Sequence, residues 1–302
     1  MGQTLLITGA TGLVGKALVK KCLAHGDTVH YLTTRKSKIK SEANYKGFYW
    51  NPQKNTIDTA CFDGVEVVIN LAGSSIAQRW TKAAKASILS SRTNALELIH
   101  SSIETHKFPI QQIISASAIG IYPDSKTRYY EEEFQGTDAS FLRTVVKSWE
   151  GRLKPFQSLG IKTTAVRIGI VLDAKEGALP KIMGPIKQYI GSALGTGEHW
   201  QSWIHIDDLV RLFRFVLESK LEGVYNAVAP NPVQQKDLVK SIAKIIKRPL
   251  FFPKVPEFAL QMLLGEMSAI ALESQRVCSK KIEDAGFQYQ YHELDVALEN
   301  LL

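Results

Sequence analysis

A chain of 302 residues can form one large α/β domain or two smaller ones, and its 45% hydrophobic and 22% charged residues are ordinary for a soluble enzyme. No apolar run approaches the roughly 20 residues that a membrane-spanning helix needs, so no membrane partner is expected. The net charge of +8 comes from scattered basic residues, without a basic helix, an RNA-binding signature or zinc-ligand spacing. An anionic cofactor or substrate accounts for this charge at least as well as nucleic acid does, and neither a nucleic-acid partner nor a metal site is expected.

Predicted strands and helices alternate through the first two thirds of the chain. Short, continuously apolar strands are expected at Thr4–Thr8, Thr28–Leu32, Val65–Ile69, Gln112–Ser115 and Lys162–Ile168. Helices are expected from Leu13 until Gly26 ends the apolar stripe, over about Thr81–His106, and over Phe141–Leu159. Because the strands are continuously apolar, they predict a parallel sheet covered on both faces, which is an α/β fold of the Rossmann-type, doubly wound kind.

Beyond Gly169 the pattern breaks into shorter pieces rich in glycine and proline. Helices are expected at about Asp207–Ser219, Val233–Ile246 and Glu257–Leu264. They predict a smaller, mostly helical C-terminal cap. The expected division is a first domain over residues 1–172 and a cap over mainly residues 173–302, with segments near residues 203–227 returning to the first domain.

The sharpest motif is Thr8-Gly9-Ala10-Thr11-Gly12-Leu13-Val14-Gly15, which lies between the first predicted strand and the first predicted helix. Glycines at such a junction let the backbone turn tightly and approach a diphosphate, while the helix N-terminus offers free N–H groups and a positive dipole end. A plain tight turn is the alternative. The strand before the motif and the helix after it favour dinucleotide binding.

The end of the second strand bears on which dinucleotide is bound. A carboxylate there would hold the adenosine ribose and repel a 2′-phosphate. This chain has Thr33 and Arg35 instead, with no acid before Glu42. A hydroxyl and a guanidinium suit a phosphate, so NADP(H) is favoured over NAD(H). The alternative is a solvated basic loop.

Three segments together resemble the extended short-chain dehydrogenase/reductase superfamily of nucleotide-sugar epimerase and dehydratase type. They are Gly9 to Gly15, Asn70-Leu71-Ala72-Gly73, and Ile114-Ser115-Ala116-Ser117-Ala118. The chain is more narrowly similar to an atypical, epimerase-like NAD(P)-binding branch with a C-terminal domain of unknown function. The stretches that carry this similarity are Arg79-Trp80-Thr81, Gly169 to Leu172, Trp200 to Leu209, Ala229 to Val233, Leu264 to Met267, Gln275 to Val277 and Ala285 to Phe287.

The resemblance implies roles for particular positions. The loop under the adenosine and its ribose would comprise Leu71, Ala72, Gly73 and Ser74. Ala116 and Ser117 would face the nicotinamide ribose, and Ile170 would lie in the segment that supports the nicotinamide ring. The substrate cleft would be faced by Trp203, His205 and Asn231. The alternatives are a core aromatic residue at Trp203 and a hydrogen-bonded core histidine at His205.

The chain departs from the superfamily at its catalytic dyad. In the superfamily this dyad, a Tyr and a Lys four residues after it, acts with a Ser to move the proton that accompanies hydride transfer, and the Lys lowers the pKa of the Tyr phenol. Ser117 fits the serine position, but Leu142 and Val146 fall where the Tyr and the Lys belong. Tyr122 is the candidate substitute acid or base, with packing at a strand end as its alternative.

Three hypotheses follow for the function. The first is an NADP(H)-dependent oxidoreductase or epimerase for a small polar substrate, nucleotide-linked molecules included, with Ser117 and Tyr122 handling protons. The second is a non-catalytic NADP(H)-binding or sensing protein that lost the dyad. The third is a nucleic-acid or cell-division interaction protein, which has the least support. Cys22, Cys61 and Cys278 are too far apart for a pair motif, which is typical of reduced thiols in a cytoplasmic protein.

Overall fold

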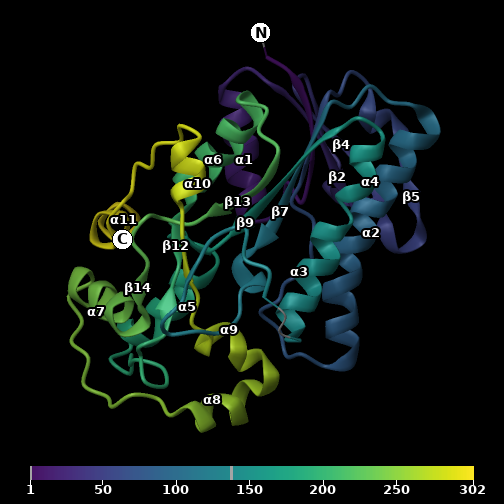
Figure 1. Cartoon of the computed structure of the whole chain (residues 1–302). Coiled ribbons are helices and arrows are strands. Elements are labelled where there is room, and N and C mark those ends of the chain that lie inside the picture. The colour runs from purple at the N-terminus through teal and green to yellow at the C-terminus, as the bar shows by residue number, and fades with distance from the viewer. Residues whose placement is uncertain (1, 137–138) are drawn as a thin grey trace.

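A computed structural model describes residues 2–136 and 139–302. Within these residues nine strands form one sheet, and most of its neighbouring strands run parallel (Figure 1). The parallel strands, in their order across the sheet, are β13 (Gly223–Ala227), β9 (Lys162–Ile168), β7 (Gln112–Ala118), β6 (Val67–Asn70), β1 (Thr4–Thr8), β2 (Thr28–Thr33) and β4 (Tyr45–Asn51). The short strands β3 (Ser41–Glu42) and β5 (Thr56–Ile57) pair antiparallel with β4.

The strand order reverses at β1, because the chain passes first to β2 and β4 on one side and then to β6, β7, β9 and β13 on the other. A ligand crevice is expected at such a switch point, beyond the carboxyl ends of the strands. The central strand is buried on both faces, and Ile7 pairs in register with Tyr31 on one side and Ile69 on the other. The predicted doubly wound Rossmann-type sheet is confirmed.

Helices cover both faces of this sheet (Figure 1). On one face α1 (Leu13–Ala24) packs against α6 (Ile206–Glu218), and on the other α2 (Lys82–His106) packs against α3 (Phe141–Gly151). The sequence analysis predicts one helix over Phe141–Leu159, but α4 (Lys154–Ser158) is separate from α3. Pro155 explains the break, because it has no N–H to continue the helical ladder.

The C-terminal part of the chain builds a second core around α5 (Ala178–Lys187), α7 (Gln235–Ile245) and α11 (Leu294–Leu301). Two further helices, α8 (Glu257–Leu264) and α9 (Ala269–Leu272), lie at the bottom of the view in Figure 1, and α10 (Lys280–Asp284) lies near α6. The remaining strands pair as β10 (Ile170–Leu172) with β12 (Trp203–His205), β11 (Trp200–Gln201) with β14 (Val233–Gln234), and β15 (Arg276–Val277) with β8 (Tyr129–Tyr130).

The C-terminal region is mostly helical, as predicted, but α6 packs beside the main sheet and β13 pairs within it. Both lie in the segment that was expected to return to the first domain. The division near residue 172 itself stays a prediction. Among the described residues no helix is long and apolar enough to span a membrane.

Candidate functional site

The three glycines between β1 and α1 have different structural roles. Gly9 has φ +67°, and a Cβ there would stand 2.5 Å from the carbonyl oxygen of Leu71. A Cβ on Gly15 would stand 2.2 Å from the carbonyl oxygen of Gly9. Gly9 and Gly15 therefore let the strand, the helix and the loop after β6 pack closely. Gly12 is exposed, and the nearest atom to its built Cβ is 3.4 Å away, so its small size matters for what approaches from outside.

The N-terminus of α1 is left open to an anion. Gly12 is its N-cap residue, no side chain caps it, and its first turn holds no acidic residue. The first N–H groups of a helix have no partner inside the helix and concentrate its positive partial charge. Leu13 and Val14 supply such groups on a helix of 12 residues. This is the arrangement that holds a diphosphate in dinucleotide-binding folds.

The loop after β6 is fixed by a chain of buried hydrogen bonds. The backbone N–H groups of Leu71 and Ala72 both donate to Oγ1 of Thr8 at 3.1 Å. That hydroxyl donates to Oδ1 of Asn70 at 2.8 Å, and Nδ2 of Asn70 donates to Oγ of Ser115 at 3.0 Å. The loop is therefore held across the carboxyl ends of β1, β6 and β7.

A cavity of about 300 Å³ opens at this edge of the sheet. It brings together six residues predicted to bind the cofactor, namely Gly9, Thr11, Thr33, Ala72, Gly73 and Ser74. Trp50, Asn51, Pro52 and Gln53, from the end of β4 and the turn after it, form another part of its wall. This part of the wall is not predicted from the sequence, because β4 is not among the expected strands.

Arg35 lies directly beside this cavity. Its backbone N–H donates to Oγ1 of Thr33 at 3.2 Å, and its side chain is exposed. The neighbouring Lys36 places its Nζ 5.3 Å from the ring centre of Tyr49. Thr33 and Arg35 therefore both stand at the end of β2, where the Thr33 hydroxyl holds the backbone that carries the exposed Arg35 side chain.

A second cavity of about 170 Å³ lies beyond the carboxyl ends of β7 and β9, and its walls are mainly apolar. Leu142 and Val146 line it, together with the predicted nicotinamide-supporting residue Ile170. Leu142 also packs against Gly120, because a Cβ built on Gly120 would stand 3.3 Å from the Cβ of Leu142. Leu142 and Val146 thus form part of the wall that a ligand in this cavity would contact, although neither side chain can transfer a proton.

Arg92 and Glu273 are the ionisable residues among those that line the second cavity. Neither residue is among the site residues predicted from the sequence. A signal for Arg92 is present, because it stands four residues after Ile88 and four before Leu96, both of which are fully buried on α2. An arginine at that spacing belongs to the inward face of the helix. Glu273, directly after α9, carries no comparable signal.

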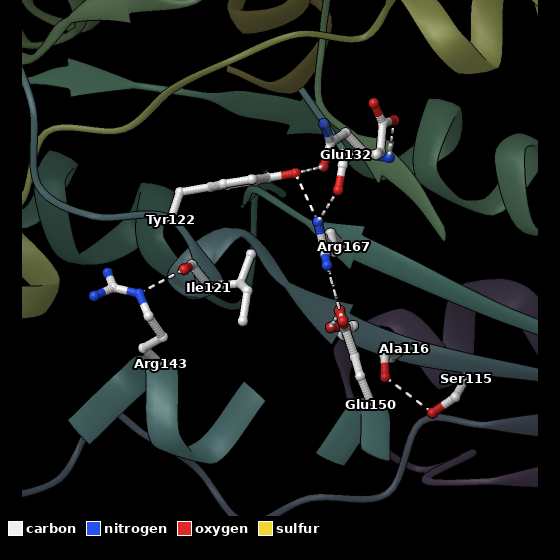
Figure 2. A network of polar contacts seen from close by, with 10 residues as sticks. Ser115, Ala116, Ile121, Tyr122, Glu132, Arg143, Glu150 and Arg167 are labelled. Carbon is white, nitrogen blue, oxygen red and sulfur yellow. Dashed lines mark hydrogen bonds and ion pairs between the residues drawn. The ribbon is translucent and has the colours of Figure 1, made fainter. Parts of the chain in front are cut away.

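Ser117 and Tyr122 line neither cavity. Figure 2 shows Tyr122 in an internal polar network, in which Arg167 contacts both its hydroxyl and Glu150. Ser117 Oγ donates to Oε1 of Glu150 at 2.6 Å. The Tyr122 hydroxyl donates to Oδ1 of Asn226 at 2.7 Å and accepts from Nη1 of Arg167 at 3.0 Å.

Tyr122 is fully buried, and this burial raises the pKa of its phenol to about 12 although Arg167 and Asn226 act to lower it. A proton donor must reach its substrate and have a pKa close to the working pH. The expected proton-transfer roles of Ser117 and Tyr122 are therefore not supported by their positions. The buried position of Tyr122 agrees with its alternative role, packing at a strand end.

Two of the expected substrate-cleft residues lie in the core. Trp203 is 0% exposed, and its indole N–H donates to the carbonyl oxygen of Asn231 at 3.0 Å. His205 is 1% exposed, stacks on Tyr291 and caps α6 by accepting the Asp207 N–H at its Nδ1. The expectation that these side chains face a cleft is wrong for both. Trp203 is a core aromatic residue and His205 is a hydrogen-bonded core histidine, because strand β12 runs inside the fold.

Asn231 is exposed, but its side chain is engaged with Glu293 and with the carbonyl oxygen of His292, and it lines neither cavity. Trp200, by contrast, lines the apolar cavity. Ala116 is buried within β7. Among the described residues there is no cluster of three or more His, Cys, Asp or Glu side chains that could hold a metal ion.

Residues 5–140 match the NAD dependent epimerase/dehydratase family, and residues 255–301 match a domain of unknown function, DUF1731. The "Epimerase family protein YfhF" of Bacillus subtilis (strain 168) is 36% identical over 301 residues, which are 99% of this chain and 98% of that protein. The chain belongs to this epimerase family. A second member, from Staphylococcus aureus (strain MRSA252), is 34% identical over 98% of both chains.

Solved structures agree with the epimerase family assignment. The crystal structure of the human epimerase family protein SDR39U1 (isoform2) with NADPH has a TM-score of 0.85 and 25% identity over 99% of both chains. A UDP-glucose 4-epimerase from Thermus thermophilus, solved in complex with NAD, has a TM-score of 0.75 and 16% identity over 99% of this chain and 97% of that chain. The second likeness shows the fold alone.

Proposed function

We propose that this epimerase family protein is an NADP(H)-dependent oxidoreductase that acts on a small polar substrate, with nucleotide-linked molecules among the candidates. One observation carries the proposal: two cavities lie at the carboxyl edge of the sheet, and a hydrogen bond between Ser74 and Arg92 links their walls. Ser74 lines the first, and Arg92, which donates to the Ser74 carbonyl oxygen, lines the second. A dinucleotide spanning them would place its adenosine in one and its nicotinamide in the other.

The phosphate loop fits such a cofactor. Gly12 stands exposed at an uncapped helix N-terminus, and a side chain there would fill the space that a diphosphate needs. Arg35 and the Thr33 hydroxyl favour a 2′-phosphate, and the human relative was crystallised with NADPH. NADP(H) is therefore proposed over NAD(H).

A bound nicotinamide would supply or accept a hydride. The chain's own contribution is an apolar wall, including Leu142, Val146 and Ile170, that keeps water away from the reacting carbon. Glu273 is the carboxyl group on this wall, where it accepts a hydrogen bond from Nε2 of Gln275 at 3.3 Å. We assign it the proton that passes to or from the substrate oxygen, in place of the missing tyrosine.

The test has two stages. NADPH and NADH are titrated into the protein while nicotinamide fluorescence is followed, and we expect NADPH to bind more tightly. Oxidation of bound NADPH is then followed with a panel of small aldehydes and ketones, and reduction of bound NADP+ is followed with small alcohols and nucleotide sugars, using the wild type and Glu273→Gln. If neither dinucleotide binds, the proposal is refuted. Equal turnover by Glu273→Gln would refute only the proton assignment.

A non-catalytic NADP(H)-binding or sensing protein is the second candidate, and one observation favours it. Leu142 and Val146 replace the two proton-handling side chains and line the cavity where they would act. This candidate predicts tight NADPH binding with no turnover of any member of the panel. The same titration and turnover experiment separates the two functions.

A further inference from the structure

Arg92 presents an unused hydrogen-bonding edge at the second cavity. Its Nη1 donates to the carbonyl oxygens of Ser74 at 3.2 Å and Ile88 at 2.9 Å. Among the described residues its Nε and Nη2 have no hydrogen-bond partner, and neither atom is sealed from solvent. Nε and Nη2 form the edge with which a guanidinium binds carboxylate or phosphate in a bidentate manner.

The guanidinium is held in place by its neighbours. Its Cζ lies 5.0 Å from the ring centre of Trp149 on α3. On another side it lies against Gly73, where a built Cβ would stand 3.0 Å from Cζ. An aromatic ring, two carbonyl oxygens and a glycine backbone thus fix the position of the cation before any ligand arrives. Such preorganisation lowers the cost of binding.

Among the residues that the structure describes, this cation also lacks a counter-ion. Arg92 forms no ion pair with any described residue, although Glu273 lines the same cavity. Burial lowers the pKa of Arg92 to about 10, which still leaves it charged at neutral pH. A charge held in an apolar wall without a partner costs free energy, and an anionic ligand would recover it.

We propose that Arg92 binds an anionic group, carboxylate or phosphate, on the substrate of this protein, and so selects small molecules with an apolar body and one acidic end. The inference rests on the proposed function, because it takes the second cavity as the substrate site. The cofactor diphosphate has a separate place, since the open N-terminus of α1 lies at the glycine loop and Arg92 lines the other cavity.

The experiment uses matched ligands that differ in charge. Butyrate, butyl phosphate and neutral butyramide are titrated into the full chain, with and without saturating NADPH, by calorimetry. We expect the wild type to bind one or both anions about 10-fold or more tightly than butyramide, as charge-assisted hydrogen bonds of this kind do. The two anions distinguish a carboxylate from a phosphate ligand. Equal binding of all three compounds overturns the proposal.

Variants locate the effect. Arg92→Met should bind butyramide as the wild type does and lose the preference for anions, whereas Arg92→Lys should keep part of it. Arg152→Gln is the control, because Arg152 lies at the end of α3, pairs with Glu97 and lines neither cavity. If Arg92→Met still prefers the anions to butyramide, the proposal is overturned. It is also overturned if Arg92→Met loses affinity for NADPH while the wild type shows no preference for anions. If Arg92→Met does not fold, the proposal is still tested by Arg92→Lys and by the comparison of anion and butyramide binding in the wild type.

The failures of the two proposals are distinguishable. NADPH titration alone tests the proposed cofactor function, and the ligand series without NADPH tests Arg92. Anion preference without NADPH binding would leave the Arg92 site standing and refute the oxidoreductase. NADPH binding with no anion preference would refute the Arg92 site and leave the proposed oxidoreductase standing.

Discussion

The hydroxyl of Ser117 donates to Glu150 over 2.6 Å, and the same carboxylate accepts Nε and Nη2 of Arg167 at 2.8 and 2.9 Å. The pair is nearly buried, with side-chain exposures of 8% for Arg167 and 17% for Glu150. Ser117 therefore supports a structural ion pair that joins α3 to the sheet.

Glu150→Ala should destabilise the protein by about 3–5 kcal/mol, because it leaves the buried Arg167 cation without its partner. Ser117→Ala removes one hydrogen bond and should cost about 1–3 kcal/mol. Urea denaturation measures both. The control is Glu97→Ala, which breaks an exposed pair with Arg152 and should cost at most about 1 kcal/mol. If Glu150→Ala were as mild as Glu97→Ala, the network would not have the structural role given to it.

Arg35→Glu should weaken NADPH binding by about 10-fold to 100-fold and leave NADH binding nearly unchanged, because only NADPH carries the 2′-phosphate. Fluorescence titration with both dinucleotides measures this. Lys46→Glu makes the same change of charge at an exposed position of the neighbouring strand β4 and should affect the binding of neither dinucleotide strongly. An equal loss for both dinucleotides in Arg35→Glu would rule out the 2′-phosphate contact.

Gly73→Ala should disturb Arg92 while leaving the loop intact. Gly73 does not have a positive φ, so the added methyl strains no backbone, but it would press on the guanidinium from 3.0 Å. We expect a loss of about 1–3 kcal/mol in stability and a weaker preference for anionic ligands. Gly184→Ala inside α5 meets no atom within 4 Å and should be neutral or stabilising by up to about 1 kcal/mol. Unchanged anion preference in Gly73→Ala would contradict the predicted contact.

His205 should make the protein less stable in mild acid. Burial lowers the pKa of His205, against the opposing effect of Asp207 and Asp208, and its neutral Nδ1 accepts the N–H of Asp207. Since the folded protein binds this proton more weakly than the unfolded chain does, the stabilisation is complete above pH ~6.5 and is lost as the pH falls below that value.

The variant His205→Asn tests this, because Asn caps helices without titrating. The fall in unfolding free energy from pH 7.5 to pH 5.5 should be smaller than in the wild type by up to about 1 kcal/mol. Burial also lowers the pKa of His199, but that residue is present in both proteins, so the difference between the two slopes reports on His205. Identical slopes would mean that protonation of His205 does not weaken the cap.

Local patterns in the sequence were enough to predict the strand–glycine–helix junction and most of the parallel sheet. Strand β9 and helix α8 have the predicted bounds, because a buried strand and an apolar helix stripe each leave a signal within a few residues. Strand β4 escaped prediction, since its apolar residues are mixed with Lys46 and Gly47 and only its place beside β2 makes it a strand.

The sequence by itself determined the residue types at the candidate site: the open glycine loop, Arg35, and the leucine and valine at the positions where the resemblance puts the catalytic dyad. Only the tertiary structure decided which side chains reach the cavities. It turned Ser117 and Tyr122 into the interior, placed Trp203 and His205 in the core, and brought Arg92 and Glu273 to one wall. The physical reason is that side-chain direction at strand ends and contacts between residues far apart in the chain depend on packing, which no local pattern encodes.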